Sequence, residues 1–167
     1  MIFKYEVIDL EIWDAYDENL NKIDGVTLIR GEKIPQGMYH LVSEIIVKHT
    51  DGDVLIMQRD FNKNFGGMWE ATAGGSAIKG DTPLMCAKRE LYEETGIKCS
   101  DLVELGTVVS KEHKTIYVLF LAIVDIDKNS IILQEGETIS YKWVSFDDLL
   151  NMSNNELTTT RVFKFLK

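Results

Sequence analysis

Alternation of apolar and polar positions predicts that the chain is built largely from β-strands. Residues 4–14 alternate in this way and predict a strand, followed by a polar turn near residues 17–19. Two further runs, 41–48 and 53–59, are rich in β-branched and aliphatic residues and flank Asp51-Gly52. Because Asp-Gly suits the tight turns that join antiparallel strands, these two runs predict a hairpin.

The rest of the chain continues this pattern around one long helix. A glycine-rich stretch, residues 62–81, predicts loop with a short strand at 69–73. Further strands are predicted at 102–109, 115–126 and 139–145, and short helices at 146–152 and 156–167. No linker, repeat or low-complexity tract interrupts the chain. We therefore expect an α+β domain with a mixed sheet.

The long helix follows the glycine-rich stretch and has recognisable ends. Thr82 can cap its N-terminus, Pro83 suits the first helical position, and Gly96 suits the left-handed residue that ends a helix. Its apolar side is predicted from spacings of three and four residues, at Leu84, Ala87 and Leu91.

The composition and net charge of the chain argue against some classes of binding partner. The chain has 167 residues, a net charge of -9 and no long cluster of Lys or Arg, which argues against nucleic-acid binding. An acidic protein that binds an anion needs help, and a divalent metal ion would supply it. Cys86 and Cys99 form no CxxC pair, so we interpret both as plain thiols.

No segment of the sequence predicts contact with a membrane. The longest strongly apolar run, residues 116–124, is far shorter than the roughly 20 residues that a bilayer requires. The first residues lack the basic and apolar regions of a signal peptide. We therefore expect a cytoplasmic protein.

Three carboxylates of the long helix, Glu90, Glu93 and Glu94, crowd onto one side of it. Like charges three and four residues apart repel by roughly 0.2–0.5 kcal/mol per pair. They could form a solvated face, or be paired, although incompletely, by Lys88, Arg89 and Lys98. They could also bind a hard cation, because oxygen ligands select magnesium or manganese.

The residues around these three glutamates favour cation binding over the other two explanations. The stretch GSAIKGDTPLMCAKRELYEETGI, residues 75–97, resembles the signature of the Nudix hydrolase family, and every defined position agrees except Asp81, where the family has glutamate. The resemblance implies an α/β/α sandwich around a mixed sheet. It also implies hydrolysis, with Mg²⁺ or Mn²⁺, of a small-molecule diphosphate, typically a nucleoside diphosphate linked to another group.

The same resemblance assigns roles by position. It implies metal ligands at Glu90, Glu93, Glu94 and the Gly74 carbonyl, with Glu90 also able to activate water. Arg89 would orient a glutamate, and Asp81 would be a supporting acid.

Residues outside the motif are weaker candidates. The resemblance implies a second acid in the loop before Trp143, at Glu135 or Glu137. Glu137 lies at the distance that is more usual in the family, and a solvated loop charge is the alternative. Arg59 is a candidate for phosphate contact, with a surface salt bridge as the alternative, and Lys63 is a weaker one. For His40 and Trp69 we expect structural roles.

The flanks resemble the branch of the family related to isopentenyl-diphosphate isomerase, from residue 10 to residue 97. Isomerases need a cysteine and a histidine where this chain has Gly74 and Ser76, which argues for hydrolysis. A non-catalytic nucleotide sensor is the other alternative. We expect one Nudix domain over residues 1–167, with a β-hairpin extension at roughly 1–35. Dimers are frequent in the family, so monomer and homodimer both stay open.

Overall fold

A mixed β-sheet forms the centre of the computed structural model, which describes residues 10–166. Its strands are β3 (His40–His49), β4 (Val54–Arg59), β5 (Trp69–Glu70), β6 (Ala73–Ser76), β7 (Leu102–Ser110), β8 (Thr115–Val124) and β9 (Thr138–Val144). Their order is β5-β4-β3-β8-β7, with β6 paired to β3 and β9 paired to β4. Among the paired strands of residues 10–166, only β3 and β8 run parallel, while the other pairs are antiparallel.

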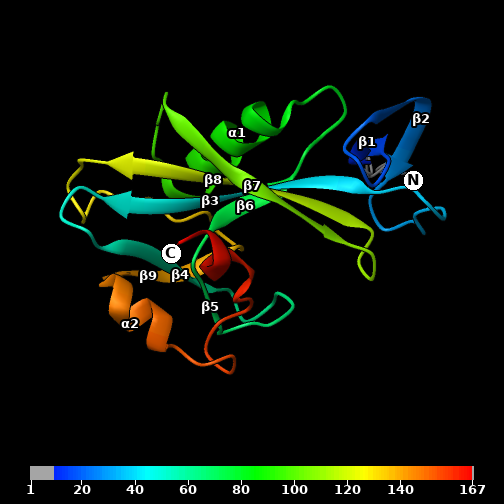
Figure 1. Cartoon of the computed structure of the whole chain (residues 1–167). Helices are drawn as coiled ribbons and strands as arrows, with labels where there is room; N and C mark the ends of the chain where they lie inside the picture. Colours follow the sequence, from blue (N-terminus) through cyan, green and yellow to red (C-terminus); the bar gives the residue numbers. More distant parts are fainter. Residues whose placement is uncertain (1–9, 167) are drawn as a thin grey trace, which may run out of the picture.

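Helices cover both faces of this sheet. Figure 1 shows α1 (Pro83–Thr95) on one face, and α2 (Phe146–Asn151) with the 3₁₀ helix η1 (Arg161–Phe165) on the other. Each face has its own apolar core: Leu91 of α1 belongs to one, and Leu149 of α2 and Val162 of η1 belong to the other. The predicted α+β sandwich is therefore confirmed.

The ends of α1 are those that its sequence predicts. The Thr82 hydroxyl accepts a hydrogen bond from the Met85 amide, and Gly96 adopts a left-handed φ of 74°. The buried side differs in one residue from the prediction: Leu84 is 40% exposed, whereas Cys86 is buried beside Ala87 and Leu91.

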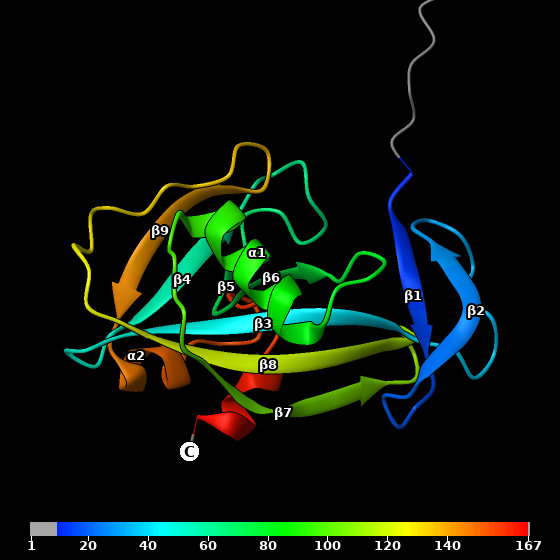
Figure 2. The ribbon, with the colours of Figure 1, turned by 90° about the horizontal axis from the view of Figure 1, so that it is seen from above.

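Strands β1 (Ile12–Tyr16) and β2 (Lys22–Ile29) form a separate two-stranded sheet at one end of the molecule (Figure 2). Trp13 and Leu28 give it a small apolar core of its own. Tyr16 and Tyr39 exchange backbone hydrogen bonds of 2.9 Å, which join this hairpin to the segment before β3. Residues 4–9 of the strand that we predicted lie outside the described residues, and β1 begins only at residue 12.

The helix predicted at 156–167 is wrong in its first half. Trp69 donates a backbone hydrogen bond of 2.7 Å to Glu156 and accepts one of 2.9 Å from Thr158, so this segment runs beside β5. A backbone group bonded to a neighbouring strand cannot serve a helix at the same time. Only residues 161–165 form a 3₁₀ turn.

The predicted strand at 69–73 is divided in two for a related reason. β5 pairs with β4, whereas β6 pairs with β3, so the chain changes partner between them. Within residues 10–166, no helix is both long enough and apolar enough to cross a membrane.

Candidate active site

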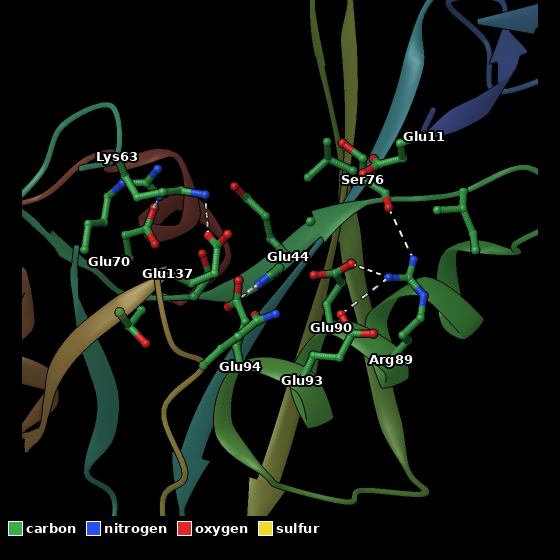
Figure 3. Close-up of a pocket in the computed structure, with 18 of the residues that line it drawn as sticks. Glu11, Glu44, Lys63, Glu70, Ser76, Arg89, Glu90, Glu93, Glu94 and Glu137 are labelled. Carbon is green, nitrogen blue, oxygen red and sulfur yellow. Dashed lines mark hydrogen bonds and ion pairs between the residues drawn. The ribbon is translucent and has the colours of Figure 1, made fainter. Parts of the chain in front are cut away.

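A cavity of about 380 Å³ lies between α1, the strands β3, β4 and β6, and the loop before β9. Figure 3 shows acidic and basic side chains from these elements facing it. The residues predicted for the site that line it are Arg59, Lys63, Gly74, Arg89, Glu90, Glu93, Glu94 and Glu137. The tertiary structure thus brings together positions that are up to 78 residues apart in the chain, from residue 59 to residue 137. Glu135 is absent from the described lining of the cavity.

Arg89 joins two of the predicted acids. Its Nη2 donates to Asp81 Oδ2 at 2.8 Å and its Nη1 donates to Glu90 Oε1 at 2.5 Å. Glu93 lies 3.8 Å from the same Nη1. The expectation of incomplete pairing was therefore wrong for Glu90, because the long Arg89 side chain folds back onto its own neighbour. The shorter arm of Asp81 still reaches the guanidinium.

Two glycines of β6 leave room for close neighbours: the Glu90 carboxylate of α1 at Gly75 and the backbone of β3 at Gly74. A Cβ at Gly75 would collide with the Glu90 carboxylate, and one at Gly74 would collide with the Ser43 carbonyl. The Gly74 amide donates a 3.1 Å hydrogen bond to Glu94 Oε2. Any larger residue at Gly75 would push the Glu90 carboxylate from its place, which explains the need for glycine there.

Glu94 is the most buried of the three glutamates, at 9% exposure. Burial raises its pKa well above the ordinary value; the hydrogen bond from Gly74 opposes this, and the charges of Glu70 and Glu90 add to it. Burial likewise raises the pKa of Glu90, although Arg89 opposes it. Among the described residues, Glu94 takes part in no ion pair. A buried carboxylate without a cation is electrostatically costly when it is ionised.

The far end of the cavity holds two further ion pairs. Arg59 Nη1 lies 2.5 Å from Glu70 Oε1, so its salt bridge is partly buried rather than on the surface. Lys63 Nζ lies 2.5 Å from Glu137 Oε2 and links the loop after β4 to the loop before β9. Burial raises the pKa of Glu70 despite the opposing charge of Arg59.

Sequence reasoning missed several residues of this cavity. Glu44 from β3, and Glu11 and Arg30 from the hairpin, line it as well. Glu11 Oε2 pairs with Arg30 Nη1 at 2.8 Å. No local motif contains any of them, and their acidic or basic character alone is too common to single them out.

Two residues for which we expected structural roles have such roles. The His40 ring stacks on Trp13 at 4.3 Å between centroids, and burial lowers its pKa. Trp69 packs against the core below β4, with Lys142 4.4 Å above its ring.

The donor set suits a hard divalent cation. The carboxylates of α1 and Gly74 line the same cavity, where the ligands on offer are carboxylate and carbonyl oxygens. Burial raises the pKa of Glu94, the charges of Glu70 and Glu90 add to this rise, and a bound cation would offset both effects. Within residues 10–166, no three His, Cys, Asp or Glu side chains form a ready-made metal cluster. Glu90 and Glu94 are instead engaged by Arg89 and by the Gly74 amide.

Comparisons with known proteins agree with this site. The family model described as the NUDIX domain matches residues 38–164. A Listeria monocytogenes protein named as an uncharacterized Nudix hydrolase is 40% identical over 89 residues, which cover 53% of this chain and 52% of that protein. An isopentenyl-diphosphate Delta-isomerase of Streptomyces coelicolor is 35% identical over 108 residues, which cover 62% of this chain and 51% of the isomerase. In each of these two matches, the chain spans about half the length of the relative.

The fold agrees as well. The crystal structure of a Nudix hydrolase from Nitrosomonas europaea superposes with a TM-score of 0.63 at 17% identity, over 84% of this chain and 72% of that one. The family model, the relatives and the shared fold lead to one conclusion: the chain belongs to the Nudix hydrolase family, and its sequence is related to the isomerase-like branch.

Proposed function

We propose that the protein is a metal-dependent pyrophosphohydrolase, which cleaves the diphosphate bond of a nucleoside diphosphate derivative or a related small diphosphate. The observation that carries this proposal is Glu94, a buried carboxylate that forms no ion pair with any described residue, in a cavity shared with Glu90 and Glu93. A buried carboxylate carries a desolvation cost while it is ionised, and a cation bound beside it offsets that cost.

Mg²⁺, or Mn²⁺ in its place, would be held by Glu90, Glu93, Glu94 and the Gly74 carbonyl. When bound, it would screen the phosphate charges and make water a better nucleophile. Glu90 and Glu94 would exchange their present partners, Arg89 and the Gly74 amide, for the ion.

The other charged residues of the cavity would bind the phosphates or orient the carboxylates. Arg59 and Lys63, at the other end of the cavity, are cations that can donate hydrogen bonds to phosphate oxygens. Arg89, anchored on Asp81, limits the orientations of the Glu90 carboxylate. Glu137 faces the same cavity and is a second candidate to accept the proton.

The reaction needs one water molecule for each bond cleaved. The water oxygen bonds to one phosphorus, the bridging P–O bond breaks, and the proton passes to a carboxylate, for which Glu90 is the first candidate. Two phosphorylated fragments leave. Because burial raises the pKa of Glu90, this carboxylate holds a proton more readily than an exposed glutamate does.

The test is turnover of a panel of nucleoside diphosphate derivatives with Mg²⁺, measured as release of nucleoside monophosphate or phosphate. Glu94→Gln is the variant of choice, because it removes the charge at nearly constant shape. We expect its rate to fall by at least 100-fold. Glu104→Gln, an exposed site on β7, is the matched control and should keep full activity. Equal activity of the wild type and Glu94→Gln would contradict the proposal.

A second candidate function is a sensor that binds nucleotides without cleaving them. Asp81 in place of the family glutamate is the feature that favours it. A sensor would be stabilised by metal and nucleotide but would release no phosphate. Isomerisation is the weaker alternative, since Gly74 and Ser76 stand where isomerases need cysteine and histidine.

The wider organisation is also part of the proposal. We propose one Nudix domain over residues 1–167, with the N-terminal hairpin as an extension, acting in the cytoplasm on a small molecule rather than on nucleic acid or membranes. Sedimentation of the purified protein would distinguish monomer from homodimer.

A further inference from the structure

Glu44 is an acid of the cavity that lies outside the family signature. It extends from β3, where its backbone is paired with Gly74 of β6, and is 7% exposed. Figure 3 shows its side chain between Glu137 and Glu90. Both of its oxygens accept hydrogen bonds from Arg161, one from Nε at 3.1 Å and one from Nη2 at 2.5 Å. A two-point contact of this kind holds a carboxylate in one orientation.

Arg161 is itself held firmly, although it lies 117 residues further along the chain. Its guanidinium stacks on the Tyr117 ring at 3.6 Å. The segment before it is fastened to Trp69 by two backbone hydrogen bonds. The C-terminal segment therefore holds Arg161 against Glu44 in a preorganised position.

Hydrogen-bonding capacity remains after this pairing. A carboxylate offers about four lone-pair sites, and Arg161 uses two of those on Glu44. Thr138 also lines the cavity, is 7% exposed, and its hydroxyl has no hydrogen-bond partner among the described residues. Buried polar groups without partners are rare in native structures, and a ligand is one explanation.

The lining of the cavity favours a polar ligand. Of its described residues only Val42 and Ile78 are apolar, and none is aromatic, so this wall has no ring for stacking and little surface for an alkyl chain. Its uncharged side chains with hydrogen-bonding groups are Thr72, Ser76, Gln134 and Thr138. Such a surface binds hydroxyl groups better than hydrocarbon groups, because its polar side chains need hydrogen-bond partners when a ligand excludes water.

From these observations we propose that Glu44, fixed by Arg161, is a specificity-determining residue that accepts hydrogen bonds from sugar hydroxyls of the substrate. The substrate class is then a diphosphate that carries a hydroxyl-rich group at this position rather than an alkyl chain. This inference rests on the proposed function, because it assumes that the diphosphate occupies the same cavity.

Three probes test it, all assayed with Mg²⁺ as release of adenosine monophosphate or its dideoxy analogue. ADP-ribose carries sugar hydroxyls on both sides of the diphosphate. The n-pentyl ester of ADP lacks those on the distal side, and 2′,3′-dideoxyadenosine diphosphate ribose lacks those on the adenosine side. We expect Glu44→Gln to lower kcat/KM for ADP-ribose by about tenfold to a hundredfold, the value of a charged hydrogen bond. For the probe that lacks the contacted hydroxyls, the same variant should change kcat/KM less than threefold.

Two further variants distinguish a direct contact between Glu44 and the substrate from an effect of the substitution on folding. Glu44→Gln leaves Arg161 without its partner, so the double variant Glu44→Gln/Arg161→Gln removes both charges together. It should recover thermal stability but not the preference for hydroxylated probes. Arg161→Gln alone keeps the Glu44 charge but frees its orientation, and should raise KM for ADP-ribose with little change in kcat. Glu104→Gln on β7 is the control for charge removal.

An equal loss on all three probes would overturn the inference, because Glu44 would then act through the fold or the metal. Recovery of the preference in the double variant would overturn it as well. If the wild type cleaves none of the probes, the proposed function fails for this class. The same three compounds are then compared as ligands by calorimetry, where equal affinities would refute the inference separately.

Discussion

Leu91 anchors α1, the helix that carries the three glutamates, to the sheet. Its side chain is fully buried, in the same apolar core as Ile45 and Phe120, and it follows Glu90 directly in the chain. Leu91→Ala removes three carbon atoms from a site that the rigid strands below cannot easily refill. This substitution therefore measures how strongly packing holds the helix in place.

The magnitude follows from burial. Each buried methylene contributes about 0.8 kcal/mol, so the transfer part of the loss is roughly 2.4 kcal/mol. The cavity left behind adds to it, which gives a total of about 3–5 kcal/mol. For a chain of this size, 1 kcal/mol shifts the melting temperature by about 2–4 °C, so we expect Tm to fall by roughly 6–20 °C.

Urea unfolding followed by tryptophan fluorescence gives the free energy directly, since the chain has three tryptophans. Met85→Ala on the same helix is the matched control, because Met85 is 54% exposed and its truncation should cost less than about 0.5 kcal/mol. A loss below about 1 kcal/mol for Leu91→Ala, or one equal to that of Met85→Ala, would refute the reasoning.

Three other predictions concern the metal, an acidic side chain and the helix cap. Mg²⁺ at 100 times its dissociation constant should raise the free energy of unfolding by about 2.7 kcal/mol, an effect that EDTA reverses and that Glu94→Gln loses. Lys128 lowers the pKa of Asp51 from 3.8 to about 2, so ionised Asp51 stabilises the fold above pH 3.8 and loses this effect as the pH falls through 2. The Tm difference between wild type and Asp51→Asn should therefore shrink as the pH falls from 3.8 to 2 and vanish below pH 2, and a constant difference from pH 2 to 6 would contradict this. Thr82→Ala should cost about 1 kcal/mol in urea unfolding, whereas Thr82→Ser should keep most of the cap; equal losses would argue against the capping hydrogen bond.

The site divides into a predictable part and an unpredictable one. Glu90, Glu93 and Glu94 are visible in the sequence because one helix repeats them at spacings of three and four. Their surroundings are not visible: Glu94 is buried where α1 meets Gly74 of β6, and the cavity it shares with Lys63 is completed by the loop after β4. Arg89 lies between these cases: the family resemblance implies that it orients a glutamate, but only the folded chain shows that it contacts both Asp81 and Glu90.

The sequence by itself determined the local elements. Periodicity and capping residues set α1 from Pro83 to Thr95, and runs of β-branched residues set the strands, because these signals act between residues close in the chain. Only the tertiary structure decided that Glu44 meets Arg161 across 117 residues, and that residues 156–158 run beside β5 instead of forming a helix. Such contacts depend on sheet order and on competition for backbone hydrogen bonds, which are properties of the whole fold.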